Sequence, residues 1–353
     1  MIDCGHYFLY KQNNKYDHKI SGNPAFTIVE LLVVIVVIGI LAAITIVSYT
    51  GISSRATISS LQSDLTNAST QLKIFNVGNS VYPTTISTDC AAQPDTTTNK
   101  CLKSSNGITY SYYVDNTASK QNFCVTATKD NYSYSISNNG AVIPVAYCPV
   151  LYLDAGNTAS YPGSGTTWTD LSGNGNDAVL SGGFSYSSAN GGSISFDGVN
   201  GSAIVNVFKS NIADFFSVSA WMKFDKYAYM QPLSMSNIFA FKWRISGQNT
   251  YWNIYNNLAY DNSISYALAP NINEWHYYTF TYDGLNEKIY LDGISKTQFT
   301  KTILLSSPTS LDIAPSSGEV VDGSISNVSV YDRSLSSTEI FRTFDTLKGR
   351  YGL

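Results

Sequence analysis

The longest apolar run of the chain covers residues 31–47, which contain one glycine, one threonine and no charged residue. Its length is close to the ~20 residues that a helix needs to cross a bilayer. A polar segment, residues 1–25, precedes the run, and the change of character falls between Ala25 and Phe26. A secretory signal instead has a shorter apolar core that is followed by its cleavage site. Because the order is reversed, we expect a removable leader and a retained membrane helix over residues 26–47.

A second apolar pattern predicts that this helix continues beyond the membrane. Six apolar residues follow one another at intervals of three and four, which places them on one face of a helix. They are Ile58, Leu61, Leu65, Ala68, Leu72 and Phe75. Polar residues such as Asp64 are expected on the other faces, and the Tyr82-Pro83 pair should end the helical region.

From Ile108 onward, apolar and polar residues alternate in short runs. Residues 108–114, 122–128, 131–137 and 142–147 predict three or four antiparallel strands with polar turns. Beyond residue 150 many more short runs are separated by Asp-Gly or Asn-Gly pairs, which indicates a β-sandwich or jelly roll. These runs cover residues 192–198, 202–208, 216–224, 250–255, 274–284, 287–293, 310–314 and 323–332.

The composition limits the choice of partners. Only 13% of the residues are charged and the formal net charge is -4, so nothing favours nucleic acid or an anionic membrane as ligand. Most of the surface must therefore consist of uncharged polar residues. A length of 353 residues leaves room for two domains after the membrane helix.

The sequence FTIVE, from Phe26 to Glu30, followed by LLVVIVVIGILAAI, resembles the class III signal of type IV prepilins and pseudopilins. In that family a peptidase cuts just before a Phe, methylates the new N-terminus and leaves a Glu as the fifth mature residue. The resemblance implies cleavage between Ala25 and Phe26, with methylation of Phe26. It also implies that Glu30 pairs with the free amino group of a neighbouring subunit during assembly. The family usually has Gly where this chain has Ala25, so we expect slow processing.

Four motifs of the C-terminal part resemble laminin-G-like, concanavalin A-like jelly rolls. They are WTDLSGNGN (168–176), SISFDG (193–198), the pair EWHYYTFTYDG and KIYLDG (274–293), and ISNVSVYDRSLSSTEI (325–340). Together they span about 180 residues. The last motif fits a short helix with Ser336 as N-cap and Glu339 three residues later, which is a capping box. The expected fold is therefore an α+β pilin (26–149), with a long N-terminal helix and a small antiparallel sheet, followed by an all-β jelly-roll sandwich (150–353).

The chain without its leader keeps four cysteines, Cys90, Cys101, Cys124 and Cys148, in a part that should lie outside the cell. An even number of cysteines in that compartment indicates two disulfide bonds, for which three connectivities exist. We favour Cys90–Cys101 and Cys124–Cys148 because each joins near neighbours. The second also resembles the loop that closes many pilin heads.

Catalytic residues are sparse in the expected sandwich. Glucanases on this fold need two carboxylates close together on one strand, yet Glu274, Glu287, Glu319 and Glu339 have no acidic residue two positions away on a plausible strand. His276 alone remains after removal of the leader, which makes a zinc set or a serine triad improbable. Strand alternation predicts that His276 faces solvent. We therefore expect a protein without enzymatic activity.

The Asp-Gly pairs 197-198, 283-284, 292-293 and 322-323 are expected to be hairpin turns. Some relatives bind calcium through loop Asp residues, so calcium is an open option without named ligands, and no other cofactor is expected. The least family-like stretch, residues 227–260, is dense in aromatic residues that suit sugar rings or protein hot spots. The alternative is that half of them alternate into the core. These candidates are Tyr227, Tyr229, Trp243, Tyr251, Trp252 and Tyr255.

Taken together, these features predict a minor or tip subunit of a type IV pilus that displays a lectin-like module for adhesion. The expected partners are other pilin subunits, the inner-membrane assembly machinery with its prepilin peptidase, and a surface glycan or protein. The subunit should begin in the cytoplasmic membrane and end on the cell surface. One alternative is a pseudopilin of a type II secretion or DNA-uptake machine, and another is a surface-tethered glycan hydrolase.

The leader leads to a first prediction, that Phe26 is the N-terminus of the assembled protein. Intact-mass analysis of the surface form should give a chain that starts at Phe26 and carries one additional methyl group. Filaments that contain chains beginning at Met1 would contradict this prediction.

Overall fold

The structure is a computed structural model that describes most of the chain from residue 27 onward. It leaves out residues 118–119, 210–211, 213–214, 227, 237–238, 247–248, 257–263, 267–270, 301–307 and 316–317. Side chains are also left out at residues 46–51, 120 and 239 and in the strands between 242 and 266. The chain divides into two compact units, Met1–Ser54 and Arg55–Leu353, and each is described by itself.

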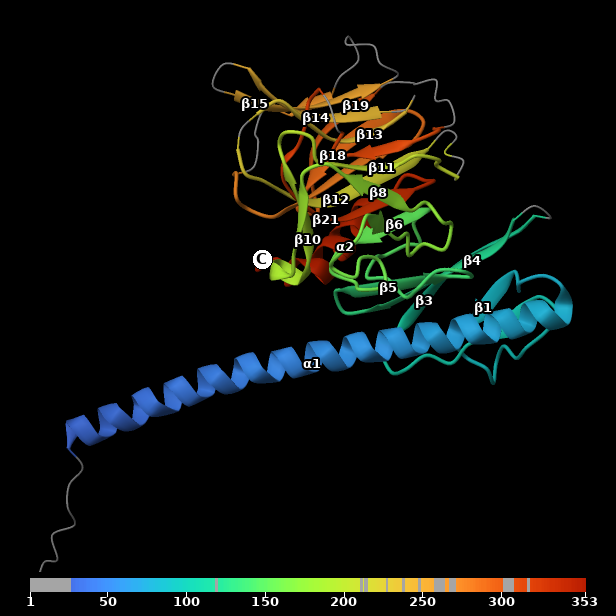
Figure 1. Ribbon diagram of the computed structural model, residues 1–353. Coiled ribbons are helices and arrows are strands. Elements are labelled where there is room, and N and C mark those ends of the chain that lie inside the picture. The colour runs from blue at the N-terminus through green and yellow to red at the C-terminus, as the bar shows by residue number, and fades with distance from the viewer. Residues whose placement is uncertain are drawn as a thin grey trace, which may run out of the picture. The chain divides into compact units, whose positions relative to one another are not determined.

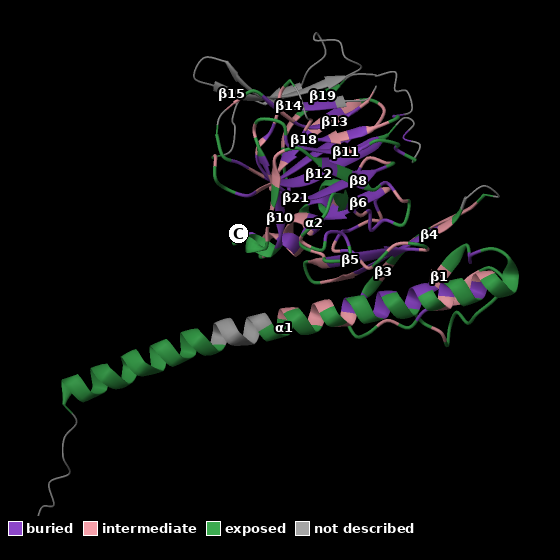
Figure 2. Ribbon diagram, viewed as in Figure 1, coloured by how far each residue is buried: buried purple, intermediate pink, exposed green. Residues whose placement is uncertain are grey.

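The first unit contains the apolar half of helix α1, whose full extent is Ile28–Asn79. Ile28–Thr45 is long and apolar enough to cross a membrane. Its side chains are exposed on all sides, as the green part of the helix in Figure 2 shows. An apolar surface all round a helix is the pattern of a membrane span. The predicted membrane helix is thus present as a helix.

The second half of α1 is one-sided and carries a small antiparallel sheet. The predicted stripe is buried, with Leu61, Leu65 and Leu72 fully covered. It packs against strands β3 (Thr109–Thr117), β4 (Lys120–Lys129) and β5 (Tyr132–Ser137), which pair in that order. Asp64, expected on another face, is also buried because the backbone N–H of Ser105 donates to its carboxylate at 2.6 Å. We call this assembly, residues 55–148, the head.

Both disulfide bonds of the head are those favoured from the sequence. Cys90–Cys101 closes the loop between β1 (Thr85–Ser87) and β2 (Asn99–Cys101), two short strands that pair in parallel. Cys124–Cys148 joins β4 to the last residue of the head. The helix ends at Asn79, slightly before the predicted Tyr82-Pro83, where Ser80 adopts a φ of 59°.

The second face of the head sheet is covered as well. The three serines of β5, Ser133, Ser135 and Ser137, are buried together with Thr126 of β4. The segment 141–148 lies on this side, and Ile143 forms a two-way backbone bridge with Ser135. That bridge is isolated, so residues 142–147 do not form the fourth strand that the sequence left open. We call these four small polar residues the serine face.

The remaining chain forms two sheets, each of eight strands in the described residues, all antiparallel. The first sheet has the order β19 (Ile294–Thr300), β18 (Asn286–Leu291), β17 (His276–Tyr282), β12 (Phe216–Phe224), β21 (Asp322–Tyr331), β10 (Ser193–Asp197) and β9 (Phe184–Ser187), with β6 (Leu151–Asp154) also paired to β21. The second has the order β16 (Ile264–Tyr266), β15 (Asn249–Asn256), β14 (Phe239–Ser246), β13 (Met230–Met235), β20 (Leu311–Ile313), β11 (Ser202–Val205), β8 (Ala178–Ser181) and β7 (Thr167–Trp168).

The two sheets enclose one apolar core, as Figures 1 and 2 show for the stacked, largely buried strands. Alternate residues of β12, including Val218 and Met222, face side chains of the second sheet such as Leu233 and Ile313. This architecture is an all-β sandwich of the jelly-roll type. The runs predicted for the sandwich all contain strands, whereas others, such as β6, β13 and β19, were not predicted. All four residues of β6 are buried, so this strand has no alternation.

Helix α2 (Ser337–Lys348) covers the outer side of the first sheet. Its N-terminus has the predicted capping box, in which Ser336 and Glu339 each accept a backbone N–H of the other. Ile340 and Leu347 of α2 join an aromatic cluster around Trp221. Arg350, just after the helix, forms a bidentate pair with Asp154 at 2.6 and 3.0 Å, which holds the C-terminus on the sandwich.

Candidate functional sites

The first candidate site is the start of α1. Ala25 and Phe26 lie outside the described residues, but Glu30 is described and fully solvent-accessible within this chain. Its carboxylate accepts the backbone N–H and the hydroxyl of Thr27, both at 2.8 Å, while the Glu30 N–H donates to the Thr27 hydroxyl at 3.2 Å. This is a reciprocal capping box, which satisfies N–H groups that a helix start leaves unpaired. Glu30 thus has a local role, and its pairing with a neighbouring amino group stays a prediction.

The second candidate site is the aromatic stretch of the sandwich. Tyr229 is exposed, at 55% of its surface, and Tyr227 lies outside the described residues. The other four candidates lie on the paired strands β14 and β15, with Trp243 opposite Trp252 and Ala240 opposite Tyr255. Their side chains are outside the description. The structure therefore places all four on one pair of strands of the second sheet without deciding which residues contact a ligand.

Asp312 is a functional candidate that the sequence reasoning missed. It lies in the middle of β20, where its cross-strand partners are Ile204 and Ser234. The same cross-strand row continues to Ala240 and Tyr255 of the aromatic hairpin. Burial raises the pKa of the Asp312 carboxyl despite a hydrogen bond to Ser234. Groups with shifted pKa values are more frequent at functional sites than elsewhere, and the isolated acid within SLDIA was the available signal.

His276 does not face solvent as predicted. Its side chain is only 14% exposed, and Nδ1 lies 2.7 Å from a carboxylate oxygen of Asp292. The other Asp292 oxygen accepts the backbone N–H of Tyr277 at 2.9 Å. The prediction failed because Asp292 comes from the turn between β18 and β19, and strand alternation carries no information about it. Asp292 thus fixes the turn between β18 and β19 to the first residues of β17.

The Asp-Gly pairs serve three different purposes. Asp292-Gly293 is a hairpin turn with φ values of 53° and 78°, and Asp283-Gly284 joins β17 to β18. Asp197-Gly198 instead connects the two sheets, between β10 and β11. Asp322-Gly323 lies inside β21, so the predicted turn there is wrong: pairing with β10 and β12 extends the strand through it.

The acidic residues give no metal cluster in the part of the chain that the structure describes, since no group of three His, Cys, Asp or Glu is placed to hold an ion. Calcium binding therefore stays an untested prediction. The four Glu residues considered for catalysis lie on separate elements: Glu274 precedes β17, Glu287 is on β18, Glu319 precedes β21, and Glu339 is in α2. Glu339 is engaged by Arg333 and the helix cap.

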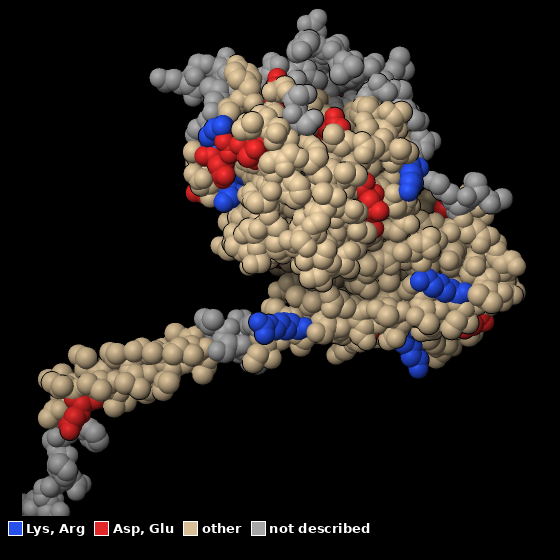
Figure 3. All heavy atoms as spheres, in the orientation of Figure 1, with Lys and Arg blue, Asp and Glu red and all other residues tan. Residues whose placement is uncertain are grey.

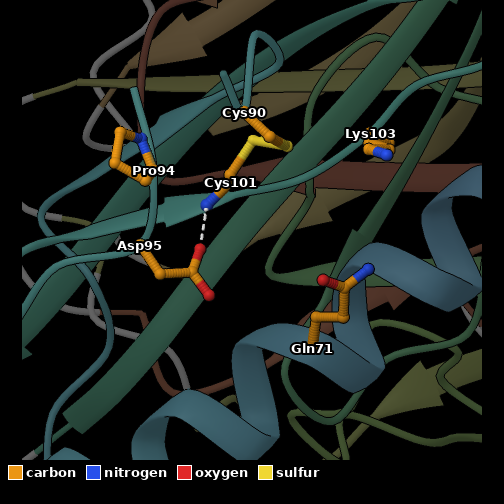
Figure 4. A pocket seen from close by; sticks show the side chains of 6 residues that line it. All are labelled: Gln71, Cys90, Pro94, Asp95, Cys101 and Lys103. Carbon is orange, nitrogen blue, oxygen red and sulfur yellow. Dashed lines mark hydrogen bonds between the residues drawn. A yellow bond between two sulfur atoms is a disulfide. The ribbon is translucent and has the colours of Figure 1, made fainter. Parts of the chain in front are cut away.

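A surface hollow of about 330 Å³ lies in the head beside Cys90–Cys101 (Figure 4). Asp95 points toward the backbone of the disulfide loop, where it accepts the Cys101 N–H at 2.7 Å and pairs with Lys100. The Lys100 hydrogen bond lowers the pKa of Asp95. The acidic group of the hollow is thus used to fasten the loop. Figure 3 shows that charged side chains are sparse on the visible face, in line with the composition.

Comparison with protein families identifies two segments. Residues 21–46 match the model of the prokaryotic N-terminal methylation motif. Residues 197–341 match the model of the concanavalin A-like lectin/glucanases superfamily. Both parts of the fusion expected from the sequence are confirmed. The chain is pilin-like at its N-terminus and lectin-like in its sandwich. No curated protein matches the chain.

Several solved structures are similar to the sandwich. A receptor-binding domain of botulinum neurotoxin type G is 20% identical, covering 56% of this chain and 51% of its own, with a TM-score of 0.43. Domain 4 of AbnA, a GH43 extracellular arabinanase from Geobacillus stearothermophilus in complex with arabinotriose, is 14% identical, covering 55% and 97%, with a TM-score of 0.44. A Trypanosoma rangeli sialidase is 20% identical, covering 58% and 33%, with a TM-score of 0.43. The chain spans about half the length of the first, and TM-scores this low assign no ligand.

The raised pKa of Asp312 leads to a second prediction. The folded protein holds this proton to higher pH than the unfolded chain, so stability falls as pH rises from about 3.8 through the raised value. Asp312→Asn removes this loss and should raise the melting temperature at pH 7, with the two proteins converging below pH 3.8.

Asp283 provides a control of opposite sign. Burial acts to raise its pKa, but hydrogen bonds from Asn286 and Leu285 outweigh burial and lower it. Asp283→Asn should therefore lower the melting temperature at pH 7. A decrease with Asp312→Asn as well would show that Asp312 stabilises the fold in its ionised form.

Proposed function

We propose that this protein is a minor or tip subunit of a type IV pilus and that its sandwich binds a glycan or protein on a surface. The observation that carries the proposal is the order of the matched segments along one chain. A methylation motif and an apolar helix come first, and a lectin-like domain follows. The subunit is inserted in the cytoplasmic membrane, processed by a prepilin peptidase, and then assembled into an extracellular filament.

The assembly part of the proposal is supported by the apolar half of α1. Its apolar side chains are exposed in the described chain. In a membrane lipid covers them, and in a filament the equivalent helices of other subunits replace the lipid. Glu30 then exchanges part of its hydrogen bonding to Thr27 for an ion pair with the free amino group of a neighbour. The partners are other pilin subunits and the inner-membrane assembly machinery.

The recognition part is supported by the concanavalin A-like match and by the aromatic hairpin with Asp312 on the second sheet. Sugar rings pack on aromatic faces while a carboxylate accepts their hydroxyl groups. Tyr229 is already exposed in this region. We propose binding without turnover, because no second carboxylate lies on β20 beside Asp312. Calcium is the one cofactor that we retain, and nothing in the charge pattern favours nucleic acid.

A pseudopilin of a secretion or DNA-uptake machine is the second candidate, since the methylation motif is common to both classes. In that role the sandwich would contact cargo or envelope. A surface-tethered glycan hydrolase is the third candidate, because the matched superfamily includes glucanases. Localisation of the processed protein to extended filaments would favour the pilus.

The role of Glu30 leads to a third prediction. Glu30→Ala should leave membrane insertion intact, because removal of a charge makes the helix more apolar, and should strongly reduce incorporation into sheared filaments. Thr27→Val removes the hydroxyl of the capping box but leaves the carboxylate, so it should have a much smaller effect. Processing at Phe26 is measured by mass spectrometry in both variants. If the two variants were incorporated equally well, Glu30 would act only as a helix cap and the pairing role would be wrong.

The aromatic hairpin leads to a fourth prediction, tested with the full chain in detergent on a glycan array. Tyr251→Ala or Tyr255→Ala should weaken binding by ~1–3 kcal/mol and leave the melting temperature nearly unchanged, because their strand positions alternate with the core-facing ones. Tyr255 also shares the cross-strand row of Ala240 and Asp312. Phe299→Ala is the control, since this aromatic side chain is 48% exposed on the other sheet. A sharp fall in melting temperature would place the Tyr in the core. Release of reducing sugar by the wild-type protein would make it an enzyme.

A further inference from the structure

We propose that the head and the sandwich form one cooperative unit, in which α2 and the serine face join them without a hinge. The sequence places the boundary between the two domains at Pro149 and Val150, which are too short for a flexible linker. The structure surrounds this junction with contacts from both sides. The inference does not depend on the ligand or on the filament, and it determines how the binding module is mounted on the head.

The serine face carries the first set of contacts. Ser133 and Ser135 have no exposed surface, and Ser137 and Thr126 are nearly covered. Burial of hydroxyl groups is costly unless they find partners. Ser137 donates to the backbone carbonyl of Ser172 in the sandwich at 2.9 Å. Without the sandwich, this face of the head sheet would lose part of its cover.

Helix α2 carries the second set of contacts and serves both parts of the protein. Its threonine hydroxyls face the head: Thr346 accepts the N–H of Ser133 at 3.0 Å, and Thr343 accepts the N–H of Ala146 at 3.1 Å. Its apolar residues, including Leu347, pack into the aromatic cluster of the sandwich. Figure 1 shows α2 beside β5. Two threonines near the C-terminus thus accept hydrogen bonds from backbone N–H groups of the head.

Two glycines show how closely the two backbones approach. A Cβ at Gly140 would lie 2.8 Å from the carbonyl oxygen of Ser172, and a Cβ at Gly173 would lie 2.5 Å from the carbonyl carbon of Asn139. Between them, the N–H of Ala141 donates to the carbonyl of Leu171 at 3.1 Å. Backbone contacts this close leave no space for relative rotation.

Apolar and aromatic contacts complete the junction. Ile143 and Val145 of the head form a buried cluster with Tyr152 and Leu171 of the sandwich. On the other side of the junction, the guanidinium of Arg333 lies 3.7 Å from the ring centre of Tyr147. A small core shared by two domains makes their unfolding cooperative, because neither can open without exposing it.

The test uses the full chain in detergent and two kinds of variant. Gly140→Val places a side chain against the sandwich backbone at Ser172 and against the Ser137 hydroxyl of the head. Thr343→Val combined with Thr346→Val removes only two hydroxyl groups at nearly constant volume and therefore tests the contact between α2 and the head selectively. Gly349→Ala is the control, because nothing lies within 4 Å of a Cβ at this position beside α2. Hydrogen exchange is followed for the amides of residues 131–147 and of β12 and β17, and calorimetry follows thermal unfolding.

Wild-type protein and Gly349→Ala should show one thermal transition that includes the head and the sandwich. Both disruptive variants should accelerate exchange in residues 131–147 by at least about tenfold while β12 and β17 stay protected, because the head then opens on its own. Two separate transitions in the wild-type protein would overturn the proposal. So would unchanged exchange in residues 131–147 of the double threonine variant.

Discussion

The head depends on one apolar seam, the contact between the stripe of α1 and the sheet β3–β4–β5. Three strands alone do not form a stable sheet in water unless one face is covered. Leu61, Leu65 and Leu72 provide that cover, and Phe123 and Val125 meet them from β4. The same helix is apolar on all sides only in its first half. The change from an all-round to a one-sided apolar surface therefore marks where the candidate membrane span ends and the head begins.

Because α1 covers one face of the sheet, the opposite face can pack against another part of the protein. In this protein that face is small and polar, so a second layer can approach it closely, and the threonines of α2 can reach its backbone. Glu30 and the apolar half of α1 act at the other end of the chain. The protein thus separates assembly from display. The apolar segment at one end is available to contact other subunits, and the sandwich at the other end is fixed on the head.

Local patterns predicted the parts of the structure that are determined locally. The three-four spacing from Ile58 to Phe75 and the Ser336–Glu339 spacing describe a helix face and a helix start, and both are confirmed. The failures involve long-range partners. Alternation in β5 suggests that serines face water, yet Ser133 and Ser135 are fully buried. His276 meets Asp292 from the turn between β18 and β19, and Asp312 gains its environment only when β20 lies between β11 and β13.

The disulfide Cys124–Cys148 determines how a pulling force applied to the sandwich is transmitted through the head. Tension applied to the sandwich passes along the backbone from Val150 to Cys148, the last residue of the head. From there the covalent route leads through the sulfur atoms directly to Cys124 on β4. The intervening backbone, 125–147, lies outside this covalent route. Strand β5 and the serine face are within that segment, so tension along the covalent chain does not pull apart the surface that seats the sandwich.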